Sequence, residues 1–271
     1  MAIPTFMYGT AWKEERTADL VALALDAGFR AIDTANQRKH YNEAGVGEAL
    51  RRAGIARDEL FLQSKFTFES GQDHRLPYDP EAPPALQVAQ SFASSLEHLG
   101  TDYLDSYLLH GPSENVGWTD TDRAVWQSME VLFADGKAKA LGVSNVTREQ
   151  LAALVADAKI QPTFVQNRCY AKEGWGHDVR TFCKARGIIY QGFSLLTANR
   201  KELKLPVISD IAKAHDATVP QVVFRAAQLQ GMLPLTGTSS PEHMALDLAC
   251  SAIGLTKAEL HTIATVADSA P

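Results

Sequence analysis

Residues 31–47 read AIDTANQRKHYNEAGVG, and this stretch changes from apolar to polar within a few positions. Its first residues belong to a strand-like segment, FRAIDTA at 29–35, and the residues after Asp33 carry hydroxyl, amide and charged side chains. A buried strand that opens into a polar loop and then into a helix is the repeating unit of α/β proteins. The same unit recurs along the whole chain.

Eight strand-like segments alternate with amphipathic helical patterns, and no linker rich in proline or serine divides them. The strand-like segments are TFMYG at 5–9, FRAIDTA at 29–35, LFLQSKF at 60–66, DSYLLHG at 105–111, AKALGVSN at 138–145, TFVQN at 163–167, IIYQGFS at 188–194 and MLPLTGT at 232–238. Helical patterns such as those at 18–28, 85–100, 122–136 and 220–231 end in glycine, a common helix stop. The series predicts an α/β fold: one (β/α)₈ TIM barrel with parallel strands, a single domain over residues 1–271. A Rossmann domain is the competing architecture, but no G-x-G-x-x-G turn follows the first strand.

Composition narrows the class of protein. The chain has 271 residues, 45% of them hydrophobic, and a formal net charge of −6. Such a chain can bury a large core but would repel a nucleic-acid backbone, so we expect no nucleic-acid partner. Its three cysteines are far apart, which favours a reducing compartment without disulfides. Without an apolar run of about 18 residues or a signal-peptide pattern, we expect a cytoplasmic protein that does not bind membranes.

Polar side chains stand at the ends of successive predicted strands, where barrel enzymes place their chemistry. Asp33 ends the second strand, Lys65 lies near the end of the third, and His110 ends the fourth. A lysine inside an apolar strand must be paired when it is desolvated, and Asp33 could supply the partner. Taken singly, these residues could be a turn-forming aspartate, an edge lysine and a structural histidine. Their shared position on three successive strands favours a functional group.

Seven segments resemble the aldo-keto reductase family in their order and spacing. They are GFRAIDTA followed by NEAGVGEAL, FLQSKF, LGTDYLDSYLLHGP, GKAKALGVSN, PTFVQN and FCKARGIIYQGFSLL. The resemblance implies an NAD(P)H-dependent oxidoreductase that reduces an aldehyde or ketone to an alcohol, or catalyses the reverse reaction. Hydride would come from nicotinamide C4 and the proton from a tyrosine. The expected partner is a small carbonyl or alcohol substrate, the expected state a monomer or small homo-oligomer, and no metal is expected.

The resemblance assigns roles residue by residue. Asp33, Lys65 and His110 fall on three of the family's four catalytic positions, with His110 orienting the substrate oxygen, Lys65 lowering the pKa of the tyrosine and Asp33 anchoring Lys65. Phe193 falls where the family usually stacks a tyrosine on the nicotinamide. The remaining matches to cofactor or pocket positions are Ser144, Asn145 and Gln166 for the nicotinamide carboxamide, and Thr10, Ser194 and Leu196.

The fourth catalytic position is ambiguous because the loop after Asp33 is two residues longer than the family pattern. Counting forward from Asp33 places the tyrosine position at Arg38, and counting back from Glu43 places it at His40. Tyr41 is adjacent to His40, and a longer loop could bring its hydroxyl into the site. We expect Tyr41 to be the proton donor, with His40 as the second candidate. The alternative is that Tyr41 only packs the loop.

The loop after the eighth strand also departs from the family. Gly237 and His243 stand where the family has a lysine and an arginine for the 2′-phosphate of NADP, Thr238 stands in the same motif, and Asp247 replaces an adenine-contacting asparagine. Two fixed cations are therefore missing, although Thr238, Ser239 and Ser240 and the helix start after them could bind a phosphate. We expect NADP as the cofactor, with NADPH preferred only modestly and NADH possible.

Two further departures affect the substrate side. Gly111 replaces a tryptophan after the fourth-strand histidine and should widen the pocket. We also expect the chain to lack the family's N-terminal hairpin and long C-terminal loop. The displaced tyrosine keeps open a second function, a cofactor-binding regulatory subunit of the same fold with weak or no catalysis. A metal-dependent hydrolase would need clustered histidines, which the sequence does not show.

Overall fold

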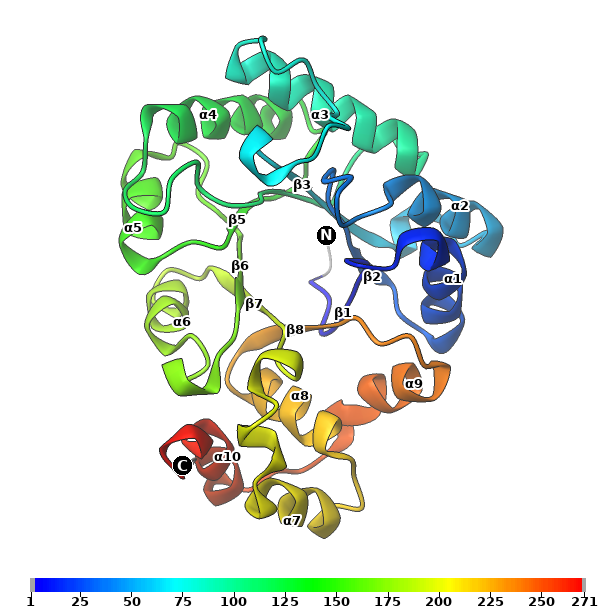
Figure 1. Ribbon diagram of the computed structural model, residues 1–271, viewed down its shortest axis with the longest axis vertical. Coiled ribbons are helices and arrows are strands. Elements are labelled where there is room, and N and C mark those ends of the chain that lie inside the picture. The colour runs from blue at the N-terminus through cyan, green and yellow to red at the C-terminus, as the bar shows by residue number, and fades with distance from the viewer. Residues whose placement is uncertain (1–2, 270–271) are drawn as a thin grey trace.

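The computed structural model describes residues 3–269, and its centre is a closed barrel of eight parallel strands in chain order. Figure 1 looks along the barrel, with the strands as an inner ring and the helices outside it. The strands are β1 Met7–Gly9, β2 Ala31–Asp33, β3 Phe61–Phe66, β4 Ser106–Leu109, β5 Leu141–Ser144, β6 Phe164–Arg168, β7 Ile189–Phe193 and β8 Met232–Thr236. Seven of them lie within the segments expected to be strands, and β6 extends one residue beyond its expected segment, to Arg168. The predicted (β/α)₈ barrel is therefore confirmed.

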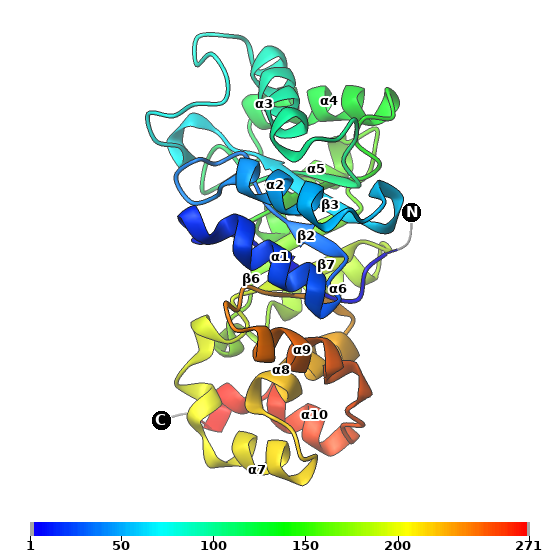
Figure 2. The ribbon, with the colours of Figure 1, turned by 90° about the vertical axis from the view of Figure 1, so that its right-hand side faces the viewer.

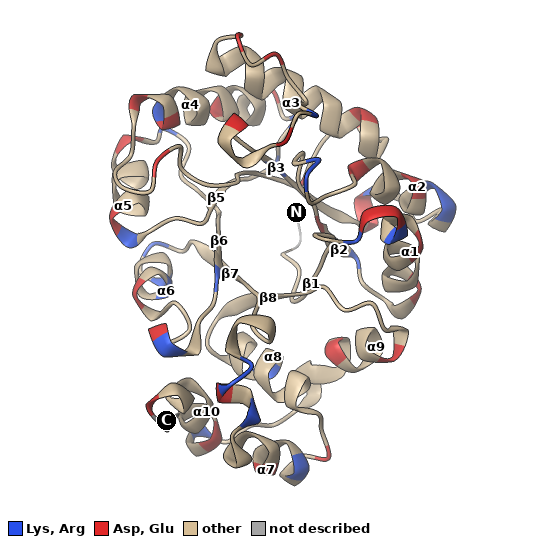
Figure 3. Cartoon of the chain, in the orientation of Figure 1, with Lys and Arg blue, Asp and Glu red and all other residues tan. Residues whose placement is uncertain are grey.

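Helices cover the outside of the ring (Figures 1 and 2). They are α1 Thr17–Ala27, α2 Glu43–Ala53, α3 Pro84–Leu99, α4 Asp120–Ala134, α5 Arg148–Asp157, α6 His177–Lys184, α7 Pro206–Ala214, α8 Val219–Leu229, α9 Pro241–Ala249 and α10 Lys257–Ala264. Two of them, α7 and α10, pack on α8 and lie farther from the barrel. Charged residues lie mainly on these helices and the loops, whereas the ring of strands is largely free of them (Figure 3).

Local sequence explains where the helices begin and end. Four helices start with a capping box, in which a threonine and the residue three positions later cap each other's backbone; the pairs are Thr119–Asp122, Thr147–Gln150, Thr218–Gln221 and Thr256–Glu259. Gly28 and Gly100 end α1 and α3 in the left-handed conformation, as their place in the sequence predicts. The caps at Thr119 and Thr147 set where the loops after β4 and β5 end and their helices begin.

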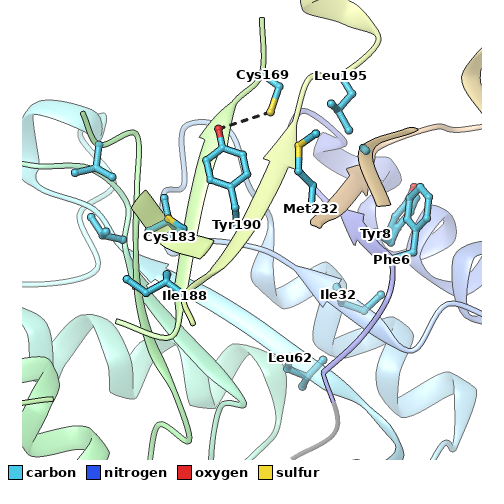
Figure 4. Packing of buried hydrophobic residues seen from close by; sticks show 14 of the residues in the cluster. Phe6, Tyr8, Ile32, Leu62, Cys169, Cys183, Ile188, Tyr190, Leu195 and Met232 are labelled. Carbon is cyan, nitrogen blue, oxygen red and sulfur yellow. Dashed lines mark hydrogen bonds between the residues drawn. The ribbon is translucent and has the colours of Figure 1, made fainter. Parts of the chain in front are cut away.

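Two apolar layers lie on opposite sides of the strands. Alternate strand residues point outward against the helices, including Tyr8, Ile32, Leu62 and Tyr190 in Figure 4, where the Tyr190 hydroxyl lies 3.7 Å from the Cys169 Sγ. A separate cluster lines the other side of the same strands: Met7, Ala31, Phe61, Leu108, Ala140, Phe164, Leu233 and Leu235. The barrel is thus a packed core rather than a pore.

Gly47 allows α2 and α3 to pack closely. A Cβ at this position would collide with the backbone carbonyl of His98 on α3. We expect Gly47→Ala to lower the free energy of unfolding by about 1–3 kcal/mol or more, because neither helix backbone can move without repacking. Urea denaturation measures this change. Gly254→Ala is the matched control, since a Cβ there meets nothing within 4 Å, and an equal effect of both substitutions would contradict the prediction.

Candidate active site

A buried ion pair lies at the C-terminal ends of β2 and β3. Lys65 on β3 donates from Nζ to Asp33 Oδ1 at 2.7 Å and to the Thr34 carbonyl at 2.8 Å. The relative exposure of Lys65 is 0% and that of Asp33 is 3%, so Lys65 is not an edge residue with its head group in solvent. Burial lowers the pKa of the Lys65 ammonium, and the charge of Asp33 opposes this shift. The structure therefore joins two of the residues expected to act together.

Three glutamine side chains form a polar layer across the barrel, and two of them bond directly to the Asp33 carboxylate. Asp33 Oδ1 accepts hydrogen bonds from Gln63 Nε2 at 2.6 Å and from Gln166 Nε2 at 3.0 Å. Gln191 on β7 accepts from both of these amides, at 2.8 and 2.9 Å, and donates back to Gln63 at 2.8 Å. Gln63 and Gln191 were not among the site residues expected from the sequence. Their signal was position: each lies two residues before a candidate, Lys65 or Phe193, and so points to the same side of its strand.

Tyr41 lies beside the ion pair, and His40 does not contact it. The Tyr41 ring centroid is 5.4 Å from Lys65 Nζ and 5.8 Å from the centroid of the His110 ring. The His40 ring stacks on Trp12, with centroids 3.7 Å apart, and its Nδ1 is buried without a hydrogen-bond partner among residues 3–269. Of the two candidate donors, Tyr41 is therefore the one whose ring faces Lys65 and His110.

The longer loop reaches this position by folding into a turn. Tyr41 and His40 both donate their backbone N–H to the Gln37 carbonyl, at 3.0 and 3.1 Å. Asn42 then caps α2 by accepting from the Gly45 N–H at 3.0 Å. The turn takes up the two extra residues before the helix starts. Within the part of the chain that the structure describes, the Tyr41 hydroxyl makes no hydrogen bond.

The electrostatics of Tyr41 differ from the expectation in direction. Burial raises the pKa of the phenol, and the negative charge of Asp33 raises it further. The expected depression of this pKa by Lys65 is not the net result, because burial is the largest effect and Asp33 acts in the same direction. Tyr41 is therefore held in the protonated form, which is the form a proton donor needs at the start of a turnover.

His110 is held as a neutral imidazole. Burial, the Lys65 charge and His40 keep its pKa well below the usual range. Its Nδ1 lies 2.7 Å from the Thr67 hydroxyl, which leaves Nε2 free to face a substrate. The long loop after β3 fixes Thr67 in turn, because the Tyr78 hydroxyl donates to the Thr67 carbonyl at 2.8 Å. Gln72 donates to the Asn36 carbonyl at 2.7 Å, so this loop shapes the site rather than hanging free.

The residues expected to hold the nicotinamide surround the same opening, and several are partly engaged. Ser144 donates to the Gln166 carbonyl at 2.7 Å, and Asn145 Nδ2 donates to the His110 carbonyl at 2.8 Å. Both Gln166 amide hydrogens are used within the barrel, whereas its Oε1 accepts no hydrogen bond from a described residue. Phe193 is partly exposed, with the Arg168 guanidinium 5.5 Å from its ring, and Ser194 and Leu196 follow it, also partly exposed. Asn145 and Ser194 have φ of 52° and 56°, a strained backbone that turns their side chains at the barrel mouth.

The other expected cofactor residues belong to the adjoining β1 and β8 loops. Thr10 is buried and donates to the Asp33 carbonyl at 3.0 Å, so its hydroxyl braces β2. Thr238 and Ser239 lie between β8 and α9, next to Gly237, and His243 is exposed in the first turn of α9. Asp247 is only 3% exposed and accepts from the Thr236 hydroxyl at 2.7 Å, which turns its carboxylate inward.

The family model described as "Aldo/keto reductase family" matches residues 5–268. The chain belongs to this family. It is 32% identical to morphine 6-dehydrogenase of Pseudomonas putida over 258 residues, which are 91% of this chain and 81% of that protein. It is 34% identical to glyoxal reductase of Bacillus subtilis over 230 residues, 84% of this chain and 75% of that protein.

A solved structure agrees with this assignment. The aldo-keto reductase MGS-M4, from a deep-sea metagenome library of the Medee basin, superposes with a TM-score of 0.85 at 26% identity. The match covers 98% of this chain and 92% of that one. The protein is thus an NAD(P)H-dependent oxidoreductase of the aldo-keto reductase family.

The groups left free at the barrel mouth suit a nicotinamide. A carboxamide both donates and accepts hydrogen bonds, and Gln166 Oε1 and the second Asn145 amide hydrogen remain available as acceptor and donor. The partly exposed ring of Phe193 offers an apolar face. Among residues 3–269, no group of three or more histidine, cysteine, aspartate or glutamate side chains could hold a metal ion. In the same range, no helix combines the length and the apolar character needed to cross a bilayer.

Asp247 makes stability depend on pH. Burial raises the pKa of its carboxyl to about 6, more than the Thr236 hydrogen bond and the nearby His243 lower it. Because the folded pKa exceeds the unfolded value of about 4, the folded state loses stability as pH rises from about 4 to about 6. We expect Asp247→Asn to raise the melting temperature by more at about pH 7 than at about pH 4. Thermal unfolding at both pH values measures this, and a gain that is larger at acid pH would refute the assignment.

Proposed function

We propose that this protein reduces a small aldehyde or ketone to an alcohol, or runs the reverse reaction, with Tyr41 as the proton donor and NADPH modestly preferred over NADH. The observation that carries the proposal is the position of the Tyr41 ring, 5.4 Å from the Lys65 ammonium and 5.8 Å from the His110 ring. The named activities of two relatives, a glyoxal reductase and a morphine dehydrogenase, support carbonyl and alcohol substrates.

The protein's own groups account for the proton. As a carbonyl oxygen becomes an alkoxide, it needs preorganised donors at once. His110, with Thr67 donating to Nδ1, would carry its hydrogen on Nε2 and point it at that oxygen. An alkoxide is a stronger base than a phenolate, so Tyr41 gives up its proton despite a raised pKa. Lys65 then stabilises the phenolate, and Asp33 keeps Lys65 in place.

The cofactor enters this scheme through its reactive carbon. When bound, a reduced nicotinamide supplies hydride to the carbonyl carbon. Asn145 and Gln166 would hold its carboxamide, Ser144 would support them, and Phe193 would pack against the ring. Thr238, Ser239 and His243 would face the adenosine end. The regulatory-subunit alternative depended on a displaced tyrosine, and the ring position of Tyr41 beside Lys65 favours catalysis over it.

Removal of the ammonium tests the core of the proposal. We expect Lys65→Met to abolish turnover of aldehydes and ketones, because the phenolate of Tyr41 would lose its counter-charge. The affinity for NADPH, measured by quenching of protein fluorescence, should change little. Unchanged binding would show that the variant is folded. The assay is cofactor oxidation with a panel of carbonyl compounds. Turnover equal to that of the unaltered protein would refute the mechanism.

The identity of the proton donor has its own test. We expect Tyr41→Phe to lower kcat at least about a hundredfold, the usual loss for a positioned acid, because the phenyl ring keeps the packing and removes the proton. His40→Ala is the matched control, and it should lower kcat less because His40 packs on Trp12. The reverse order of effects would identify His40 as the donor.

A further inference from the structure

The loop after β1 carries a lysine into the loop after β8. β1 and β8 pair to close the barrel, so the loops that follow them are neighbours at its rim. Lys13 lies in the first loop, and its Nζ donates a hydrogen bond to the backbone carbonyl of Gly237 in the second. Tyr8 reinforces the junction by donating from its hydroxyl to the Thr238 carbonyl at 2.9 Å. The ammonium therefore stands beside the residue that replaces the expected family lysine.

This ammonium lacks a counter-charge. No carboxylate lies within ion-pair distance of Lys13 in the region from residue 3 to residue 269, and the same holds for Arg16. Burial lowers the pKa of Lys13, and the charge of Arg16 lowers it further. One of its three hydrogens is bound by Gly237, which leaves two for another acceptor. A half-buried, unpaired cation next to a second cation is a favourable partner for an anion.

The residues on both sides of Lys13 have strained backbone conformations, and these help to position the lysine. Trp12 and Glu14 have φ of 60° and 52°, values that non-glycine residues rarely adopt. Trp12 is anchored by its N–H to the His40 carbonyl at 2.8 Å, and Asn42 holds the Glu14 carbonyl at 3.3 Å. The proton-donor loop thus fixes the direction of Lys13 toward Gly237.

The facing loop offers hydroxyls but no fixed charge. Thr238 accepts the Ser240 N–H at 3.3 Å, and Ser240 caps α9 by accepting the His243 N–H at 3.3 Å. The Ser239 side chain is exposed at the same corner. Such a donor set can position a phosphate at a helix start, but a neutral set discriminates poorly between a phosphate and a hydroxyl. The positive charge that would distinguish NADPH from NADH must therefore come from another part of the fold.

We propose that Lys13 supplies the cation for the 2′-phosphate of NADPH and so determines the choice of NADPH over NADH. The assignment rests on the proposed function, because it takes the Gly237–Ser240 loop as the adenosine end of the cofactor site. The cation has moved from the β8 loop to the β1 loop, and barrel closure brings it back to the same place. Lys13 is thus a specificity-determining residue outside the expected phosphate motif.

Binding measurements separate this role from catalysis. The dissociation constants of NADPH and NADH are measured by fluorescence quenching for the unaltered protein and for Lys13→Met. We expect the NADPH constant to rise by at least about tenfold, the typical effect of losing a charge-assisted hydrogen bond, and the NADH constant to change less than about twofold. Lys213→Met is the matched control, because Lys213 is an exposed lysine on α7. An equal loss for both cofactors, or no loss for either, overturns the proposal.

A second variant moves the charge back. A Cβ at Gly237 would approach only the Gly9 carbonyl at 3.5 Å and Lys13 Nζ at 3.7 Å, so a lysine fits there. We expect Lys13→Met combined with Gly237→Lys to recover most of the NADPH preference, and failure to recover it counts against Lys13 as a charge donor. Turnover of the unaltered protein with carbonyl compounds tests the proposed function separately. If the protein reduces carbonyl compounds but its preference for NADPH is unchanged in Lys13→Met, the role of Lys13 is refuted and the proposed function stands.

Discussion

The site depends on the cost of burying one ammonium. Lys65 is fully buried, and removing its partner would cost about 3–5 kcal/mol, as for other buried ion pairs. A single carboxylate oxygen of Asp33 therefore accepts hydrogen bonds from Lys65 and from amides on β3 and β6. This requirement links strands on opposite sides of the ring through a layer of glutamines. Burial, together with this buried charge, keeps the pKa of the His110 imidazole low, so the neutral ring can donate a hydrogen bond.

The sequence predicted the barrel and the central ion pair because both follow from local patterns. Strand periodicity and helix caps are each recognised from residues that are close together in the sequence. The carboxyl ends of the parallel strands then lie at the same end of the barrel. Gln63 and Gln191 escaped because an amide inside an apolar strand is ambiguous until the register across the barrel is known. They join 128 residues apart along the chain. The available signal was that each glutamine lies two residues before Lys65 or Phe193 and so points to the same side of its strand.

The position of Tyr41 could not be obtained by counting. Two extra residues can lengthen a loop at either end, and the outcome depends on the turn closed on the Gln37 carbonyl. That turn is braced from outside, because Trp12 from the β1 loop stacks on His40. The same limit applies to Lys13, whose contact with Gly237 spans 224 residues. Comparison with the family motif shows that Gly237 replaces a lysine, but it does not show that Lys13 lies beside Gly237 in the fold.

The two departures from the family pattern are physically connected. His40 in the lengthened loop fixes the Trp12 backbone, and Trp12 in turn directs Lys13 toward the β8 loop. Meanwhile Asp247, which could repel an anion at this rim, is turned inward to Thr236. The lengthened loop after β2 and the loop after β8 thus form one arrangement: the turn that places Tyr41 beside Lys65 also supports Lys13, the cation that we propose for the 2′-phosphate. The same turn therefore supports both Tyr41, whose ring lies beside Lys65 on β3, and Lys13, which contacts the loop after β8.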